Sequence, residues 1–276
     1  MASKTQRVLI LCKTYPSPSA KYSETSCVAG MDENGNLIRL YPVPFRLISD
    51  DSQFKKWQWI NVRLEKANKD HRPESHKLYV DTIQCDDNVL STRNHWTDRR
   101  YYLDKITSMF KSFDALEKAQ SLNNTSLAVI KPKRIVSLEI RKASTAEWTD
   151  EEKQKLLSLQ QQGNLFDETD EKNIRLLRKL PYDFYYIYEC ESGNENITYK
   201  HKIVDWEIGA LFWNVYTKYK GDWEEPFRKK IEQDLAQSDL MFLMGNIMRF
   251  RNQWLIVSLI YPPKLLPGQE AQQKLF

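Results

Sequence analysis

The chain has 276 residues, 41% hydrophobic and 28% charged, which is enough for one large or two small domains with buried cores. This composition excludes bulk disorder and differs from that of a membrane protein. No apolar run approaches the ~20 residues of a membrane-spanning helix, and residues 1–11 lack the apolar core of a signal peptide. We therefore expect a cytoplasmic protein with no membrane partner.

The formal net charge of +4 is unevenly distributed. Residues 1–142 contain 24 Lys and Arg against 16 Asp and Glu, a charge of +8, whereas residues 143–276 contain 17 against 21, a charge of −4. The basic excess predicts a polyanionic partner for the first half. The four cysteines are widely spaced and form no CxxC pair, so we expect buried thiols.

Short strands dominate residues 1–142, which we predict to be a small β-barrel domain. Alternation and turn signals predict strands at Val8–Cys12, Thr25–Met31, Leu37–Pro42, Trp59–Glu65, Lys77–Ile83 and Ile135–Arg141, with one helix around Tyr101–Lys118. Residues 32–36 form a Gly-containing connection of hairpin length, which makes the second and third strands antiparallel neighbours.

Residues 143–180 are expected to form an acidic helical connector. Thr149 and Glu152 have the spacing of a capping box, which predicts a helix to about Gln161. Residues 181–264 follow as a C-terminal α+β domain, and residues 265–276 as a flexible tail. This domain is predicted to contain strands Tyr182–Cys190 and Thr198–Val204, helices between Asp205 and Leu235, and strands Leu240–Met244 and Trp254–Tyr261. The fold class is therefore α+β.

Alternation also predicts which side of each early strand is polar. Ile60, Val62 and Leu64 form an apolar row, which leaves the tryptophans and arginine of that strand on the opposite side. Aromatic rings beside basic side chains suit single-stranded nucleic acid, because bases stack on rings and cations neutralise phosphates. The candidate nucleic-acid-binding residues are Lys13, Lys21, Arg39, Tyr41, Arg46, Trp57, Trp59, Arg63, His71 and Arg72. The alternative is that Trp57 and Trp59 pack against the second half or the connector.

Two further clusters contain residue types that can bind metals. His71 and His76 flank a carboxylate, but Pro73 makes the segment a loop with too few ligands for a metal site. His201, Asp205 and Glu207 share one face if their strand continues to Glu207, and that spacing would hold a divalent metal for phosphodiester hydrolysis. Alternatively, Asp205 caps the following helix and Glu207 lies in its first turn.

Common enzyme motifs are absent from the sequence. It contains no Gly-rich phosphate loop, no HExxH and no GxSxG, so we expect no cofactor and favour a protein without catalysis. Residues that converge only in space would escape such a search.

Residues 8–46 contain a strand, a variable loop, the strand Cys27-Val28-Ala29-Gly30, and the strand Leu37-Ile38-Arg39 ending near Pro42. In this pattern, and in the closing run of residues 239–264, the sequence resembles prokaryotic dual OB-fold proteins of genome-defence and DNA-modification gene clusters. The resemblance implies an OB-like first barrel, a second half that is α+β or a second OB-like domain, and nucleic-acid recognition or an adaptor role.

The leading hypothesis is a non-catalytic nucleic-acid-binding or adaptor subunit of a bacterial defence or DNA-modification system. Its basic N-terminal barrel would hold the ligand, with single strands favoured, and its acidic half would dock a protein partner from the same operon. Two alternatives stay open. One is a metal-dependent nuclease that uses His201, Asp205 and Glu207. The other is a protein–protein assembly subunit whose exposed aromatic residues are interface hot spots.

Overall fold

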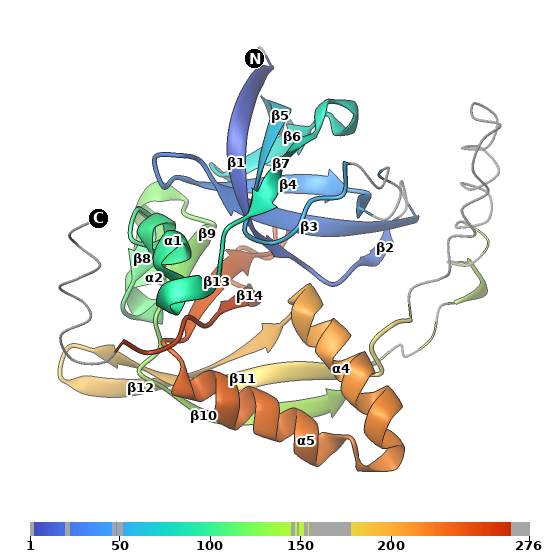
Figure 1. Cartoon of the computed structure of the whole chain (residues 1–276). Coiled ribbons are helices and arrows are strands. Elements are labelled where there is room, and N and C mark those ends of the chain that lie inside the picture. Colours follow the sequence, from blue (N-terminus) through green and yellow to red (C-terminus); the bar gives the residue numbers. More distant parts are fainter. Residues whose placement is uncertain are drawn as a thin grey trace.

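The computed structural model describes residues 3–19, 23–45, 48, 52–144, 147, 149–151, 154 and 178–265. These residues form two β-sheets of seven strands each, which lie against each other (Figure 1). None of the helices in these residues is long and apolar enough to cross a membrane.

The first sheet closes into a barrel. Its strands are β1 (Lys4–Lys13), β2 (Ser17–Ser19), β3 (Ser23–Met31), β4 (Leu37–Val43), β5 (Gln58–Lys66), β6 (Ser75–Leu78) and β7 (Gln84–Val89). Five strands form a ring in the order β1-β3-β4-β6-β5, and β5 pairs back to β1. Neighbours in this ring are antiparallel except β4 and β6, which are parallel. This connectivity is that of an OB-fold, so the predicted OB-like N-terminal barrel is confirmed.

Apolar side chains from one side of each strand fill this first barrel. Ile38 and Leu40 of β4 and Ile60, Val62 and Leu64 of β5 all belong to one buried cluster in its interior, as alternation predicts. The antiparallel pairing of β3 with β4 is also confirmed.

The second sheet contains the remaining strands, with helical segments inserted between them. A short turn η3 (Val80–Thr82) precedes β7, and helix α1 (Arg93–Leu103) links the two sheets. The later elements are β8 (Met109–Phe110), α2 (Phe113–Asn123), β9 (Leu127–Ile130), β10 (Arg134–Lys142), β11 (Tyr182–Ser192), β12 (Glu195–Ile203), α4 (Trp206–Tyr219), η4 (Lys220–Asp222), α5 (Glu224–Arg228), η5 (Lys229–Asp234), η6 (Leu235–Gln237), β13 (Met241–Asn246) and β14 (Trp254–Ile260).

The second sheet repeats the connectivity of the first. The order of its strands in space is β10-β11-β12-β14-β13-β9-β8. The parallel pair is β12 with β14, which corresponds to the parallel pair β4 with β6 of the first barrel. β9 and β10 are consecutive in the chain and pair with strands towards opposite ends of this order, β9 with β13 and β10 with β11, so together they take the place of one first strand. Pro132, which has no N–H to donate, lies in the break between them. The second half is therefore a second OB-like barrel with an interrupted first strand.

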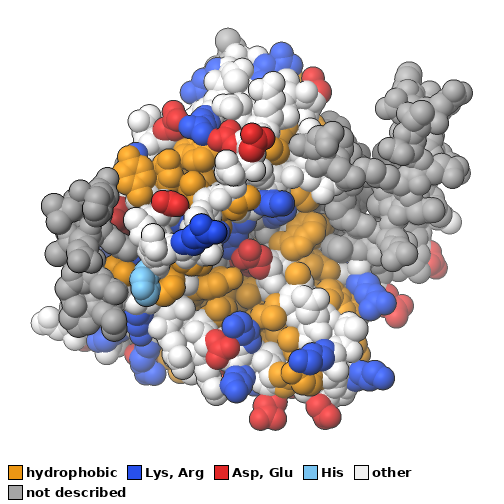
Figure 2. All heavy atoms as spheres, in the orientation of Figure 1, with side chains coloured by type: hydrophobic (Ala, Val, Ile, Leu, Met, Phe, Trp, Pro, Cys, Tyr) orange, Lys and Arg blue, Asp and Glu red, His pale blue; other side chains and the backbone are white. Residues whose placement is uncertain are grey.

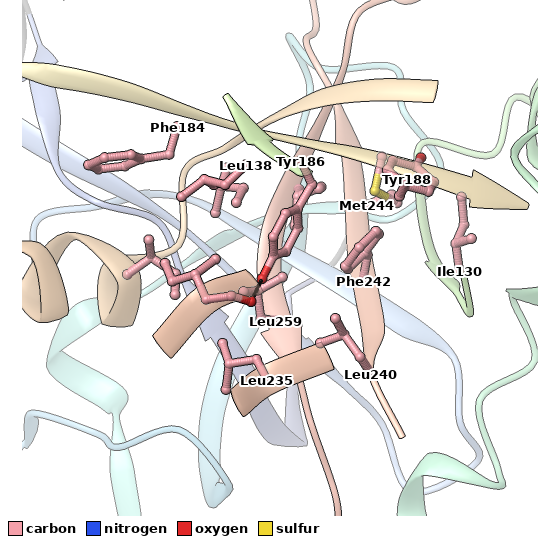
Figure 3. Close-up of a cluster of buried hydrophobic side chains, with 14 of the residues drawn as sticks. Ile130, Leu138, Phe184, Tyr186, Tyr188, Leu235, Leu240, Phe242, Met244 and Leu259 are labelled. Atoms are coloured by element: carbon pink, nitrogen blue, oxygen red, sulfur yellow. Dashed lines mark hydrogen bonds between the residues drawn. The ribbon is translucent and has the colours of Figure 1, made fainter. Parts of the chain in front are cut away.

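Helices α4 and α5 close one end of this second barrel over an aromatic core. Phe184 of β11 lies 5.6 Å from Phe212 of α4 and 4.7 Å from Phe227 of α5 between ring centroids. Figure 3 shows the hydroxyl of Tyr186 reaching across this core to donate a hydrogen bond of 2.8 Å to the carbonyl of Ile231. Burying the ring while its hydroxyl keeps a partner avoids the cost of an unpaired polar group.

Three predicted elements need correction. The strand at Ile135–Arg141 exists as β10, but it pairs with β11 of the second barrel, so the first domain ends near residue 105 and not at 142. The single helix at 101–118 is wrong, because α1 ends at Leu103 and α2 begins only at Phe113. The strand at 77–83 ends at Leu78. Most of the predicted connector, residues 143–180, and nearly all of the tail, residues 265–276, lie outside the described residues.

Candidate nucleic-acid interface

Part of the outer side of the first barrel is buried against the second barrel. Trp57 and Trp59 are 3% and 4% exposed and belong to an apolar cluster that includes Val129, Leu243 and Val257 of the second barrel. The two tryptophans therefore pack against the second half, the alternative that the sequence left open. In this structure their rings are covered and offer no stacking surface.

Both tryptophans also have cationic and aromatic neighbours within the chain. Trp57 packs edge-on against Trp96 of α1 at 5.6 Å, and the guanidinium of Arg99 lies over both rings, at 4.9 and 4.5 Å. Trp59 packs against Tyr102 at 5.2 Å. The rings and cations that suggested a nucleic-acid ligand therefore contact one another within the chain.

Arg39 and Arg72 join the two barrels instead of facing solvent. They are 3% and 7% exposed, and both donate to the backbone carbonyl of Asn246, at 3.3 and 2.5 Å. Arg39 also donates to the carbonyl of Ser126, and Arg72 pairs with Asp70 at 2.6 Å. Burial lowers the pKa of Arg39 from its ordinary value. Neither guanidinium is free to contact a phosphate.

The other predicted residues lie in different settings. The ammonium of Lys13 lies 3.8 Å from the centroid of the Phe45 ring, and burial lowers its pKa to about 8. Arg63 lies 4.0 Å from the ring of Tyr79. Tyr41 and His71 are exposed, whereas Lys21 and Arg46 lie outside the described residues.

The proposed metal cluster does not form. Asp205 caps α4, because its Oδ1 accepts the N–H of Glu207 at 2.8 Å, and its Oδ2 accepts the N–H of Leu259 at 2.7 Å. His201 instead points into the second core, 4.5 Å from Phe113. Within the described residues no group of three His, Cys, Asp or Glu could hold a metal. The nuclease hypothesis based on this cluster is therefore wrong, because β12 ends at Ile203 and its alternation does not extend to Glu207.

A different polar surface lies on the outer side of β10, β11 and β12, which we call the outer face of the second barrel. Figure 1 shows these strands on the side away from the first barrel. The strand register places Glu139 and Lys202 opposite Tyr185, and Ser137 and Lys200 opposite Ile187. The full set is Arg134, Ser137, Glu139, Arg141, Asp183, Tyr185, Ile187, Glu189, Thr198, Lys200 and Lys202.

Cations surround the one aromatic ring of this outer face. The guanidinium of Arg141 lies 5.2 Å and the ammonium of Lys200 lies 5.8 Å from the centroid of Tyr185. Both cations also pair with Glu139, and Lys202 pairs with Asp183 at 2.7 Å. The Arg141, Lys200 and Lys202 side chains are 53%, 41% and 35% exposed. Such exposed pairs contribute only ~0–1 kcal/mol, so an incoming anion can replace the carboxylates.

The sequence contained a signal for this surface that our prediction did not use. Separating the two sides of Tyr182–Cys190 would have placed Tyr185 apart from the buried Phe184, Tyr186 and Tyr188. The charge count also changes with the domain boundary. Residues 1–105 contain 17 Lys and Arg against 13 Asp and Glu, a charge of +4, and residues 106–276 contain 24 against 24. Part of the basic excess therefore belongs to β10 of the second barrel.

The face drawn in Figure 2 carries a mixed charge. Among the residues coloured there, Lys and Arg side chains alternate with Asp and Glu, and hydrophobic side chains show between them. Surfaces that bind nucleic acid usually carry an extended area of positive charge. The face drawn in Figure 2 has no such area among the residues coloured there.

Comparisons with known proteins agree with the division into two domains. A solved structure of a replication protein A heterotrimer bound to single-stranded DNA aligns over 99% of this chain and 68% of its own, with 9% identity and a TM-score of 0.26, a similarity too low to support any conclusion. No curated protein matches the sequence. A domain of unknown function, DUF8758, matches residues 4–105, and a second, DUF8757, matches residues 109–276. The two matches meet between α1 and β8, and because the second spans more than half of the sequence, the chain belongs to the DUF8757 family.

Proposed function

We propose that this chain binds single-stranded nucleic acid across the outer face of its second barrel. One observation carries the proposal. OB-folds bind oligonucleotides on the face of their second and third strands, which correspond to β3 and β4 in the first barrel and to β11 and β12 in the second. In the first barrel most of this face is buried, as Ala29, Met31 and Arg39 show, although Tyr41 near the end of β4 is exposed. In the second barrel no described residue covers it.

The chemistry of the exposed face suits a single strand. Tyr185 offers a ring for one base, which contributes ~1–3 kcal/mol when stacked. Arg141, Lys200 and Lys202 lie beside it, and Arg134 lies further along the same face opposite Glu189, so that four cations can neutralise phosphates. The three carboxylates among them limit how many phosphates can approach, so we expect a short strand and moderate affinity.

The first test is the affinity for labelled oligonucleotides of about 12 nucleotides, measured by fluorescence anisotropy for DNA and for RNA. We expect the double variant Arg141→Ala/Lys200→Ala to bind about tenfold more weakly at low salt. Its plot of log affinity against log salt should be shallower by roughly 1.4, since each lost phosphate contact on a single strand removes about 0.7. Tyr185→Ala should weaken binding by ~5-fold or more.

Lys218→Ala serves as the matched control, because Lys218 is an exposed lysine on α4 and lies outside the outer face. It should bind as the unchanged protein does. Absence of binding to either nucleic acid at low salt would exclude the proposal. Unchanged affinity in the Arg141/Lys200 double variant would show that another surface is used.

The place of the chain in a larger system rests on its sequence resemblance alone. An adaptor role in a genome-defence or DNA-modification system, a partner from the same operon and a cytoplasmic location stay predictions. Purification of the native complex from its source, followed by identification of stoichiometric partners, tests the first two.

A further inference from the structure

A small cavity lies where the first strand of the second barrel is interrupted. It has a volume of about 120 Å³ and is formed by three segments: residues 131–135 from the end of β9 to the start of β10, residues 236 and 238–240 before β13, and Lys264 after β14. Arg134 belongs both to this cavity and to the outer face, so the two sites are continuous.

The lining of the cavity is strongly cationic. It contains Lys131, Lys133, Arg134 and Lys264 against one carboxylate, Asp239. Lys131 lies 2.5 Å from Asp239, and Arg100 lies 3.3 Å from its other oxygen, so this carboxylate is already neutralised.

Two of the lining cations have no carboxylate of their own. The ammonium of Lys133 donates to the side-chain amide oxygen of Asn196 at 3.0 Å, which is a neutral partner. Lys264 forms no ion pair with a described carboxylate. Arg134 pairs with Glu189 at 2.5 Å, with a side chain that is 58% exposed. Positive charge is therefore left uncompensated at the cavity.

The volume limits what the cavity can hold. A water molecule occupies about 30 Å³ of liquid, and pockets for drug-sized ligands begin near 300 Å³. A pocket of about 120 Å³ lies well below that range and has room for a group of a few heavy atoms. Its size and charge together suit a single phosphate group.

We propose that this cavity binds one phosphate group of the nucleic-acid strand that lies on the adjoining outer face. The statement that the phosphate comes from a nucleic-acid strand rests on the proposed function. Lys133 and Lys264 supply the uncompensated charge, and Arg134 links the cavity to the rest of the strand. The phosphate is either an internal diester or a terminal monoester, and the experiment distinguishes these sources.

The first measurement titrates the full chain with inorganic phosphate at constant ionic strength, followed by isothermal calorimetry. We expect saturable binding that is at least tenfold weaker in the double variant Lys133→Ala/Lys264→Ala. Lys118→Ala, which removes an exposed lysine of α2 outside the cavity, should leave the phosphate affinity unchanged. A dissociation constant of about 20 mM corresponds to a binding free energy of only ~2 kcal/mol. Absence of saturable binding up to that phosphate concentration would overturn the inference.

The second measurement compares oligonucleotides that carry a 5′-hydroxyl, a 5′-phosphate or a 3′-phosphate. A preference of about fivefold for one phosphorylated end, lost in the double variant, assigns a terminal monoester. Equal affinities that all fall about tenfold in the double variant assign an internal diester. If no oligonucleotide binds but inorganic phosphate still binds in a lysine-dependent manner, the proposed function fails and the phosphate site stands.

Discussion

The residues of this chain that suggest chemistry mostly serve structural roles. Burial alone would lower the pKa of Lys56, but Asp205 and Glu207 raise it above its ordinary value. Lys56 lies 2.7 Å from Glu207 and donates to the carbonyl of Leu259 at 2.9 Å, which ties the first barrel to the start of α4 and to β14. Lys56 also lies 3.9 Å from the buried carboxylate of Asp205. Removing one partner of such a buried pair is strongly destabilising, whereas forming it contributes little net stability.

His201 provides a residue-scale prediction about pH. Burial lowers its pKa from 6.5 to about 4, so the folded protein keeps the ring neutral while the unfolded chain protonates it. The unfolded state then binds more protons between pH 6.5 and pH 4, and stability falls as the pH drops through this range, by about 2–3 kcal/mol. His201→Gln should remove this loss, as measured by urea unfolding across the range.

The exposed His71 provides the control for this prediction. His71→Gln should retain the full acid-induced loss of stability. A pH dependence that is the same in the unchanged protein and in His201→Gln would contradict the burial of the imidazole in the second core.

Alternation of residues predicted the two sides of each strand correctly but not what covers them. It placed Trp57, Trp59 and Arg39 opposite the barrel interior, and the structure agrees. An outward side chain faces either solvent or a neighbouring domain, and local sequence is the same in both cases. Only the pairing of residues over 200 positions apart, such as Arg39 with Asn246, decides the question.

At the scale of elements, the strand β3 explains why the Cys27-Val28-Ala29-Gly30 segment ends in glycine. A Cβ at Gly30 would lie 2.4 Å from the carbonyl oxygen of Leu9 on the paired strand β1. Backbone atoms of a paired strand cannot move aside as a flexible side chain can, so this position accepts no side chain.

Gly30→Ala is therefore expected to lower the free energy of unfolding by about 3 kcal/mol or more, because the added methyl forces β1 and β3 apart. Urea denaturation followed by circular dichroism measures the change. Gly221→Ala is the control, since a Cβ there meets nothing within 4 Å, and it should be close to neutral. A near-neutral Gly30→Ala would mean that β1 can shift to admit the methyl.

Element prediction succeeded where period and caps coincide and failed where elements are short or fully buried. The helix after Asp205 was found from its cap and its apolar repeat, and α4 confirms it. β8 has two residues, and all four residues of β9 are buried, so neither shows alternation. β10 was predicted correctly as a strand, but its own sequence does not indicate that it pairs with β11 of the second barrel.

At the scale of the molecule, the contact between the barrels is an apolar interface built around the two tryptophans. Trp59→Ala is expected to lower the free energy of unfolding by ~3–5 kcal/mol, because it leaves a cavity between the barrels. The affinity of the remaining folded protein for oligonucleotides should stay unchanged. Urea unfolding and anisotropy on the same samples measure both quantities.

Tyr101→Ala is the control for this change, because Tyr101 is an aromatic residue of α1 that is 54% exposed, and its loss should cost less than ~1 kcal/mol. The opposite result, a stable Trp59→Ala variant with lost affinity, would return the binding site to the first barrel.

The burial of the first barrel's outer side also sets the stoichiometry of any complex. A protein with two open OB faces can hold one long strand at both, and the second contact then gains from a high effective concentration. Among its described residues this chain exposes one such face, so it should take up one strand at saturation. Lengthening the oligonucleotide beyond that face should recruit additional protein molecules and should not tighten the binding of each one.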